Sequence, residues 1–209
     1  MKKIQLLLIL LLFTAMSEHD TPESSASRIV MMGDSITQGW PLTDPAFFEG
    51  KNITNKGIGG QTTPQMLARF EKDVLALRPK IVVIMAGTND IAGNTGPMTL
   101  QMTLDNIVKM TEMAKANKIK VVLCSVLPAN GFPWNRSIQP ADKIIALNQM
   151  IKAYADKNKI VYADYYRVTV DQNKGLKKEF SGDGVHPNKK GYQAMEPVLE
   201  RAIAAVSKK

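Results

Sequence analysis

The chain has 209 residues, enough for one well-buried domain with little room for a second. Its 44% hydrophobic and 22% charged residues are ordinary for a globular protein, and they form no internal repeat or low-complexity tract. The formal net charge is +8, but the lysines are dispersed and are not interleaved with aromatic residues, so we expect no nucleic-acid partner.

The first residues have the layout of a secretory signal peptide. Lys2 and Lys3 precede the apolar run Leu6–Phe13, and Ala15-Met16-Ser17 supplies small residues for a cleavage site. We therefore predict a signal peptide over residues 1–17, a polar linker over 18–27 and one domain over 28–209. The expected location is periplasmic or extracellular, with no stable membrane insertion after cleavage. An uncleaved membrane anchor or a buried N-terminal helix is the alternative.

Apolar runs rich in β-branched residues predict the strands. Because these runs are nearly continuous rather than alternating, they indicate strands that are buried on both faces. A weaker, polar run precedes a glycine-rich turn. The predicted strands are Ile29–Met32, Asn52–Lys56 (the weaker run), Ile81–Ala86, Ile119–Val126 and Ile160–Ala163.

Helical patterns lie between these strands. One begins at Thr62 or Thr63 and ends at Arg78-Pro79, a second covers about Thr99–Asn117, a third begins at Pro140, and the last begins at Pro187-Asn188. Pro197 inside the last pattern predicts a kink or a break. The alternation of strand and helix predicts a three-layer α/β/α sandwich, with a central parallel sheet of about five strands in a flavodoxin-like order.

Polar residues follow the first three predicted strands. In such a sheet the carboxyl ends of the strands form the ligand-binding edge, so Gly33-Asp34-Ser35, the turn around Gly60, and Asn89 should lie together. Ser35 stands where it could act as a nucleophile at the start of a helical turn. The N–H groups of Ser35 and Gly60 and the amide of Asn89 are suitable donors for an oxyanion hole.

The general base must come from elsewhere in the chain. Of the two histidines, His19 falls in the predicted linker, which leaves His186. Asp183 precedes it by three residues, a spacing that can place the carboxylate on one imidazole nitrogen and leave the other to face Ser35. The one cysteine, Cys124, falls in an apolar strand and is expected to be buried and inert.

Each of these signals alone has an ordinary structural explanation. A serine after a strand is usually a turn or capping residue, Asn89 could belong to an Asx-turn, and a single histidine in a loop is often a surface residue. Their combination, in this order, is much less common. The chain lacks an H-E-x-x-H zinc motif, a phosphate-binding loop and dinucleotide-binding spacing, so we expect no metal and no organic cofactor.

The same residues resemble the motifs of the SGNH (GDSL-like) hydrolases, over a region from about Arg28 to the last helix. The matching blocks are G-D-S-I at 33–36, N-K-G-I-G-G-Q-T at 55–62, G-T-N-D at 87–90 and D-G-V-H-P at 183–187. Ile36 replaces the usual leucine of the first block. The resemblance implies an ester hydrolase of the esterase/lysophospholipase-like branch. It assigns Ser35 as nucleophile, His186 as base and Asp183 as its orienting acid, with Ser35, Gly60 and Asn89 forming the oxyanion hole.

The substrate is less well defined by the sequence. Phe132 and Trp134 follow the fourth predicted strand and could stack on a sugar ring or line an acyl pocket, or they could anchor the loop. No long apolar lid is visible, so we predict short acyl esters, with acetyl esters of carbohydrates as the favoured partner. The alternatives are a lysophospholipase-like lipid esterase and a non-catalytic module that binds acylated glycans.

Overall fold

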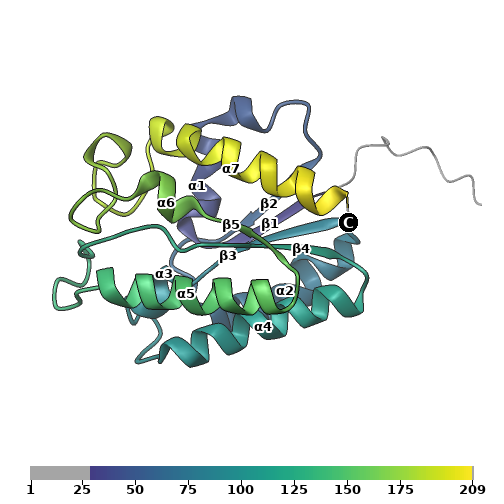
Figure 1. Cartoon of the computed structure of the whole chain (residues 1–209), viewed down its shortest axis with the longest axis horizontal. Helices are drawn as coiled ribbons and strands as arrows, with labels where there is room; N and C mark the ends of the chain where they lie inside the picture. Colours follow the sequence, from purple (N-terminus) through teal and green to yellow (C-terminus); the bar gives the residue numbers. More distant parts are fainter. Residues whose placement is uncertain (1–28, 209) are drawn as a thin grey trace, which may run out of the picture.

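The computed structural model describes residues 29–208 (Figure 1). The predicted signal peptide and linker, together with His19, lie outside the described residues. Within them, five parallel strands form one sheet in the order β2-β1-β3-β4-β5, which confirms the predicted flavodoxin-like order. The strands are β1 Ile29–Gly33, β2 Ile53–Gly57, β3 Ile81–Met85, β4 Lys120–Cys124 and β5 Val161–Ala163.

Helices cover both faces of this sheet (Figure 1). One face carries α1 and α7 with the short α6, and the other carries α2, α4 and α5 with the short α3. The helices are α1 Ser35–Thr43, α2 Thr63–Asp73, α3 Thr88–Ile91, α4 Leu100–Ala116, α5 Ala141–Lys157, α6 Tyr165–Thr169 and α7 Lys189–Ser207. The predicted three-layer α/β/α sandwich is therefore confirmed.

The central strands explain why the sheet has two cores. All five residues of β3 are buried, as its continuous β-branched run predicts. Successive side chains point to opposite faces, so Val82 and Ile84 join the core under α2, α4 and α5, whereas Ile81 and Val83 join the core under α1 and α7. The polar strand β2 lies at one edge of the sheet, where its residues are only partly buried.

Two helices differ in detail from the sequence-based expectation. Helix α2 ends at Asp73 and is followed by a short 3-10 turn, Leu75–Leu77, after which Arg78 has a left-handed backbone with φ of 47°. Helix α7 continues through Pro197, so of the predicted kink or break there is no break; Met195 and Leu199 on either side are fully buried against the sheet.

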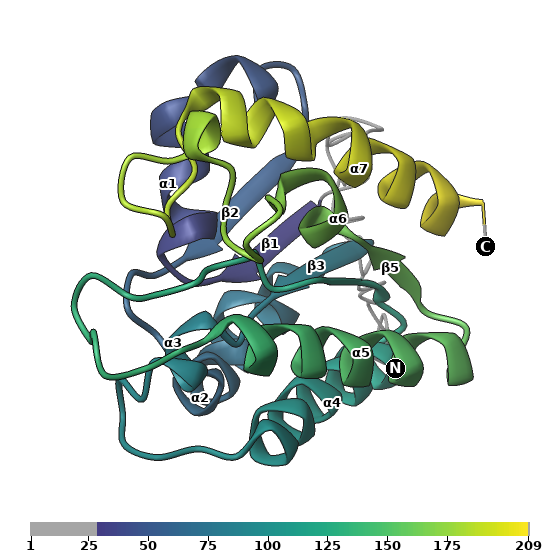
Figure 2. The ribbon, with the colours of Figure 1, turned by 60° about the vertical axis from the view of Figure 1, so that its left-hand side comes forward.

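The long loops at the carboxyl ends of the strands gather on one side of the molecule. Figure 2 shows the loop between β4 and α5 next to the loop between α6 and α7 on this side. The rings of Trp134 and His186, one from each loop, have centroids 6.0 Å apart. No helix within residues 29–208 is long and apolar enough to cross a membrane.

Candidate active site

Ser35 is the first residue of α1, and only Asp34 separates it from β1. The side chain of Asp34 caps this helix by accepting a hydrogen bond of 2.9 Å from the N–H of Ile36. Asp34 is 1% exposed, and burial raises its pKa to about 6, although the hydrogen bond from Ile36 works in the opposite direction. This local geometry places Ser35 at the amino end of α1, where the free N–H groups favour a negative oxygen.

Ser35, His186 and Asp183 form a continuous chain of hydrogen bonds. The Oγ of Ser35 lies 2.9 Å from Nε2 of His186, and Nδ1 of His186 lies 2.7 Å from Oδ2 of Asp183. The residues come from opposite ends of the domain, 151 positions apart in the chain. The sequence-predicted nucleophile, base and acid are therefore brought together by the fold.

The loop before α7 fixes Asp183 on His186. Oδ1 of Asp183 accepts hydrogen bonds from the backbone N–H groups of Val185, at 2.9 Å, and His186, at 2.8 Å. Gly184 between them has a φ of +81°, a conformation that favours glycine. A bridge between Ser181 and Pro187 closes the loop, so the carboxylate and the imidazole share one rigid turn.

The charge on Asp183 determines the tautomer of His186. Partial burial would raise the pKa of Asp183, but the hydrogen bonds from the side chain and N–H of His186 and from the N–H of Val185 lower it to about 2. An ionised carboxylate only accepts hydrogen bonds, so Nδ1 of a neutral His186 carries the proton. Its Nε2 is then an acceptor, and the hydroxyl of Ser35 donates to it.

The predicted oxyanion donors line the same cavity as Ser35. A cavity of about 210 Å³ is lined by Ser35, Gly60, Asn89, Asn94, Trp134 and His186. Gly60 has a φ of +74°, and a Cβ atom built there would meet nothing within 4 Å, so its backbone conformation and not crowding calls for glycine. Asn89 is 3% exposed and donates one of its amide hydrogens to the carbonyl oxygen of Gln61 at 3.0 Å.

Asp90 connects two of the segments that carry these donors. It is 2% exposed, and its carboxylate accepts hydrogen bonds from the N–H and the hydroxyl of Thr63 at the start of α2. Burial raises the pKa of Asp90, while the bonds from Thr63 oppose the shift. The residue after Asn89 is thus tied to the helix that follows the Gly60 turn.

The two aromatic residues predicted near the substrate have different positions. Trp134 is 46% exposed and lines the cavity, whereas Phe132 is 1% exposed and stacks beneath Trp134 with ring centroids 5.1 Å apart. Phe132 therefore has the position of a loop anchor, and Trp134 presents its ring to the cavity. Asn94, which lines the same cavity, was not predicted, because its only local signal is an ordinary Gly-Asn turn.

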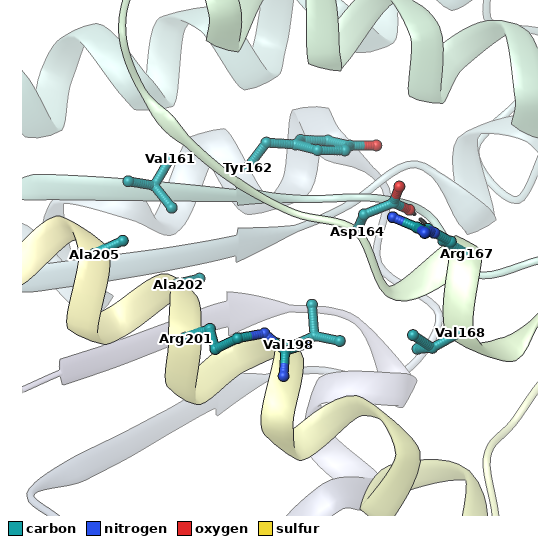
Figure 3. A pocket seen from close by; sticks show the side chains of 9 residues that line it. All are labelled: Val161, Tyr162, Asp164, Arg167, Val168, Val198, Arg201, Ala202 and Ala205. Carbon is teal, nitrogen blue, oxygen red and sulfur yellow. Dashed lines mark hydrogen bonds between the residues drawn. The ribbon is translucent and has the colours of Figure 1, made fainter.

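A larger cavity, of about 540 Å³, lies beside the edge strand β5 (Figure 3). Its lining residues come from β5, α6 and α7 and the segment between β5 and α6, and none of the sequence-predicted site residues is among them. Volume alone does not select a reactive site, since catalysis needs converging polar groups.

Cys124, in β4, is buried, and burial raises the pKa of its thiol to about 12. No group of three or more His, Cys, Asp or Glu side chains within residues 29–208 could hold a metal ion.

Comparison with known proteins identifies the relatives of the chain. Residues 31–194 match the family described as GDSL-like Lipase/Acylhydrolase. A crystal structure of a GDSL-like lipase from Bacteroides thetaiotaomicron is 50% identical and has a TM-score of 0.83, and the match covers 86% of this chain and 88% of that one.

Two curated relatives carry more specific names. An acetylxylan esterase from Xylanibacter ruminicola is 27% identical over an alignment of 218 positions, which covers 87% of this chain. A thioesterase 1/protease 1/lysophospholipase L1 from Escherichia coli K12 is 28% identical over 134 positions, which cover 60% of this chain. The matches span 44% of the length of the esterase and 60% of the length of the E. coli protein, so the aligned part of this chain covers only about half of each relative.

Proposed function

The chain belongs to the GDSL-like lipase/acylhydrolase family, and on that premise we propose that it is an exported serine ester hydrolase that cleaves short acyl esters. The observation that carries this proposal is the hydrogen-bonded chain of Asp183, His186 and Ser35, which opens into the cavity lined by Gly60 and Asn89. A nucleophile, an oriented base and oxyanion donors in one cavity are what acyl transfer requires.

The proposed reaction has two halves. As Oγ of Ser35 bonds to the ester carbonyl carbon, Nε2 of His186 takes the hydroxyl proton, and the N–H groups of Ser35 and Gly60 with the amide of Asn89 hold the oxyanion. The ester C–O bond then breaks, and the alcohol leaves with the proton from Nε2. Water attacks the acyl-enzyme with His186 again acting as base, which releases the acid and restores Ser35.

The ionised Asp183 supports the base in both halves. When Nε2 takes a proton, His186 becomes an imidazolium whose positive charge lies 2.7 Å from the carboxylate. The pKa of about 2 keeps Asp183 negative across the physiological range, so it stabilises this charge and holds the ring toward Ser35.

The cavity supports short acyl groups and a carbohydrate alcohol. Its volume of about 210 Å³ is below the range of ~300–1,000 Å³ typical of drug-sized ligands. The alcohol leaves on the side of His186, and the half-exposed ring of Trp134 adjoins His186 there, where it could stack on a sugar. Together with the acetylxylan esterase among the relatives, this favours acetyl esters of carbohydrates.

A lysophospholipase-like activity is the second candidate, because one relative carries that name. Hydrolysis rates for nitrophenyl esters from acetyl to palmitoyl, measured beside acetylated xylan and lysophosphatidylcholine, separate the two. We expect acetyl esters and acetylated xylan to be cleaved fastest. Faster cleavage of palmitoyl esters and lysophosphatidylcholine would contradict the short-acyl proposal.

Catalysis by Ser35 and His186 is tested by substitution. Ser35→Ala removes the nucleophile and His186→Ala removes the base, so each variant should lose nearly all hydrolysis of p-nitrophenyl acetate. Circular dichroism of each variant should match the unchanged protein. A folded variant that keeps most of the activity would contradict the assignment. If the unsubstituted protein is folded but hydrolyses none of the esters, that result would support a binding module instead.

Export is proposed from the sequence pattern of residues 1–17. Expression of the full chain in a bacterial host, followed by fractionation and N-terminal sequencing, should find a protein that begins near Glu18 outside the cytoplasm. Retention of an uncleaved chain in the membrane would contradict this part of the proposal.

A further inference from the structure

Asn94, in the turn after α3, connects three parts of the candidate site. Its Oδ1 accepts a hydrogen bond of 3.1 Å from Nε1 of Trp134. Its Nδ2 donates to Oδ1 of Asn89 at 2.9 Å and to the carbonyl oxygen of Gly60 at 3.3 Å. Both hydrogens and the oxygen of this amide are therefore engaged, and two of its three partners are residues of the candidate oxyanion hole.

The direction of these hydrogen bonds is fixed at both ends. The indole N–H of Trp134 can only donate, so the atom of Asn94 that faces it is the oxygen, and the NH₂ group faces Asn89. The carbonyl of Gln61 can only accept, so the atom of Asn89 that faces it is Nδ2. Asn89 thus presents its oxygen to Asn94 and one N–H to Gln61, which leaves its second N–H for the cavity.

The loop that carries Trp134 is held against the same turn. Phe132 stacks under Trp134, and Nδ2 of Asn135 donates to the carbonyl oxygen of Ala92 at 3.0 Å. The backbone N–H of Asn94 donates to the carbonyl oxygen of Asn89 at 3.1 Å. The loop between β4 and α5 therefore contacts the segment after α3 at two points, and one of them is the bond from Trp134 to Asn94.

We propose that Asn94 is a positioning residue that sets the orientation of the Asn89 amide, and that Trp134 acts through Asn94 to hold it. This inference rests on the proposed esterase function. Without Asn94, only the bond to Gln61 holds the Asn89 amide within the described residues, so the amide can tilt and carry its second N–H away from the developing oxyanion. Trp134, on the side of the cavity where the alcohol would leave, is thus coupled through Asn94 to the oxyanion hole.

A double-mutant cycle tests this role. We compare Asn94→Ala and Trp134→Phe, each alone and combined with Asn89→Ala, by kcat and KM for p-nitrophenyl acetate. Complete loss of one oxyanion donor costs ~10²–10³ in kcat, so misorientation by Asn94→Ala should lower kcat about tenfold with little change in KM. Trp134→Phe keeps an aromatic ring but loses one N–H, and kcat should fall about threefold.

The decisive comparison is the Asn89→Ala background. There we expect neither substitution to lower kcat further, because the amide that both act on is gone. Losses that persist undiminished in that background, or an unchanged kcat in both single variants, would overturn the role of Asn94. If Asn94→Ala fails to fold, the Trp134→Phe cycle decides the question alone, since it removes one hydrogen-bond donor and little volume.

A control separates this inference from the proposed function. Asn117 is exposed at the end of α4, and Asn117→Ala should leave kcat unchanged. Absence of any Ser35-dependent hydrolysis in the unsubstituted protein would overturn the proposed function itself. If the protein hydrolyses the ester but each substitution lowers kcat by the same factor with and without Asn89→Ala, only the role given to Asn94 would be overturned.

Discussion

At the scale of single residues, the site depends on groups whose charge is set by their contacts. Asp183 has a pKa of about 2 because the hydrogen bonds from His186 and Val185 outweigh the effect of its partial burial. Asp34, in contrast, is almost fully buried, and burial outweighs the hydrogen bond from Ile36, so its pKa rises to about 6. The pKa values of these two carboxyl groups are thus shifted in opposite directions from the ordinary value of 3.8.

Asp183 should make folding sensitive to acid. Its folded pKa of about 2 lies below the ordinary value of 3.8, so its contribution to stability is present above about pH 4 and is lost as the pH falls through about 2. We predict that Asp183→Asn removes this part of the acid sensitivity. The difference between the urea-unfolding free energies of the unchanged protein and the variant should shrink as the pH falls from 5 to about 2.

The control for this measurement is Asp105→Asn on the exposed surface of α4. The effect of Asp105→Asn on the free energy of unfolding should be small, since exposed polar pairs contribute little. If the effect of Asp183→Asn on the free energy of unfolding did not change with pH, that result would contradict the lowered pKa of Asp183.

At the scale of elements, the ends of β1 and β2 are tied to α2 by a single side chain. Arg69 donates from Nη2 to the carbonyl oxygen of Gly33 at 3.0 Å and from Nη1 to that of Lys56 at 2.9 Å. It also bonds the side chains of Gln61 and Asp73. The planar guanidinium suits this arrangement, because its donors are held in a rigid fork. Arg69 therefore fixes the strand ends from which Ser35 and the Gly60 turn emerge.

Arg69→Met should weaken this junction. The apolar stem is retained, but two strand-end carbonyls and the carboxylate of Asp73 lose a partner, so we predict a loss of about 2–4 kcal/mol in the free energy of unfolding. Lys72→Met, at an exposed position of the same helix, is the matched control and should change it by less than about 1 kcal/mol. If urea unfolding gives the same loss of free energy for Arg69→Met and Lys72→Met, Arg69 does not hold the junction.

The strands and the long helices were predictable from the sequence, and the short helices were not. Four of the strands follow from continuous apolar runs, and helices α4, α5 and α7 repeat apolar residues at helical spacing, so these patterns are strong. Helices α3 and α6 have four and five residues, too few for a period to show. The continuation of α7 through Pro197 depends on packing against the sheet, which no local rule reports.

The candidate site divides in the same way. Ser35, Gly60 and Asn89 follow strands, and Asp183 and His186 share a short spacing, so the residues that belong to motifs were found from the sequence. Asn94 and Arg69 were missed because their partners lie far along the chain. The bond from Trp134 to Asn94 joins residues 40 positions apart, and the bond from Arg69 to Gly33 joins residues 36 positions apart.

At the scale of the whole molecule, one sheet separates two hydrophobic cores. Leu147 of α5 and Leu199 of α7 are both fully buried, but they lie in different cores. The strands between them contribute alternate side chains to each core, so neither layer can loosen without exposing the sheet. We therefore expect the described domain to unfold as one cooperative unit.

Leu147→Ala and Leu199→Ala test this expectation. Each should lower the free energy of unfolding by about 2–5 kcal/mol, because each removes a fully buried side chain and leaves a cavity. Urea unfolding followed by circular dichroism and by tryptophan fluorescence should give one coincident transition for both variants. Two separate transitions, one affected by each substitution, would contradict a single domain.

The central claim, that His186 and Asp183 activate Ser35 as a nucleophile, is tested most directly by labelling with a fluorophosphonate and locating the adduct by mass spectrometry. We predict about one equivalent of label on the peptide that carries Ser35, no label in Ser35→Ala, and much slower labelling in His186→Ala. An unlabelled folded protein, or a label on another residue, would contradict the account.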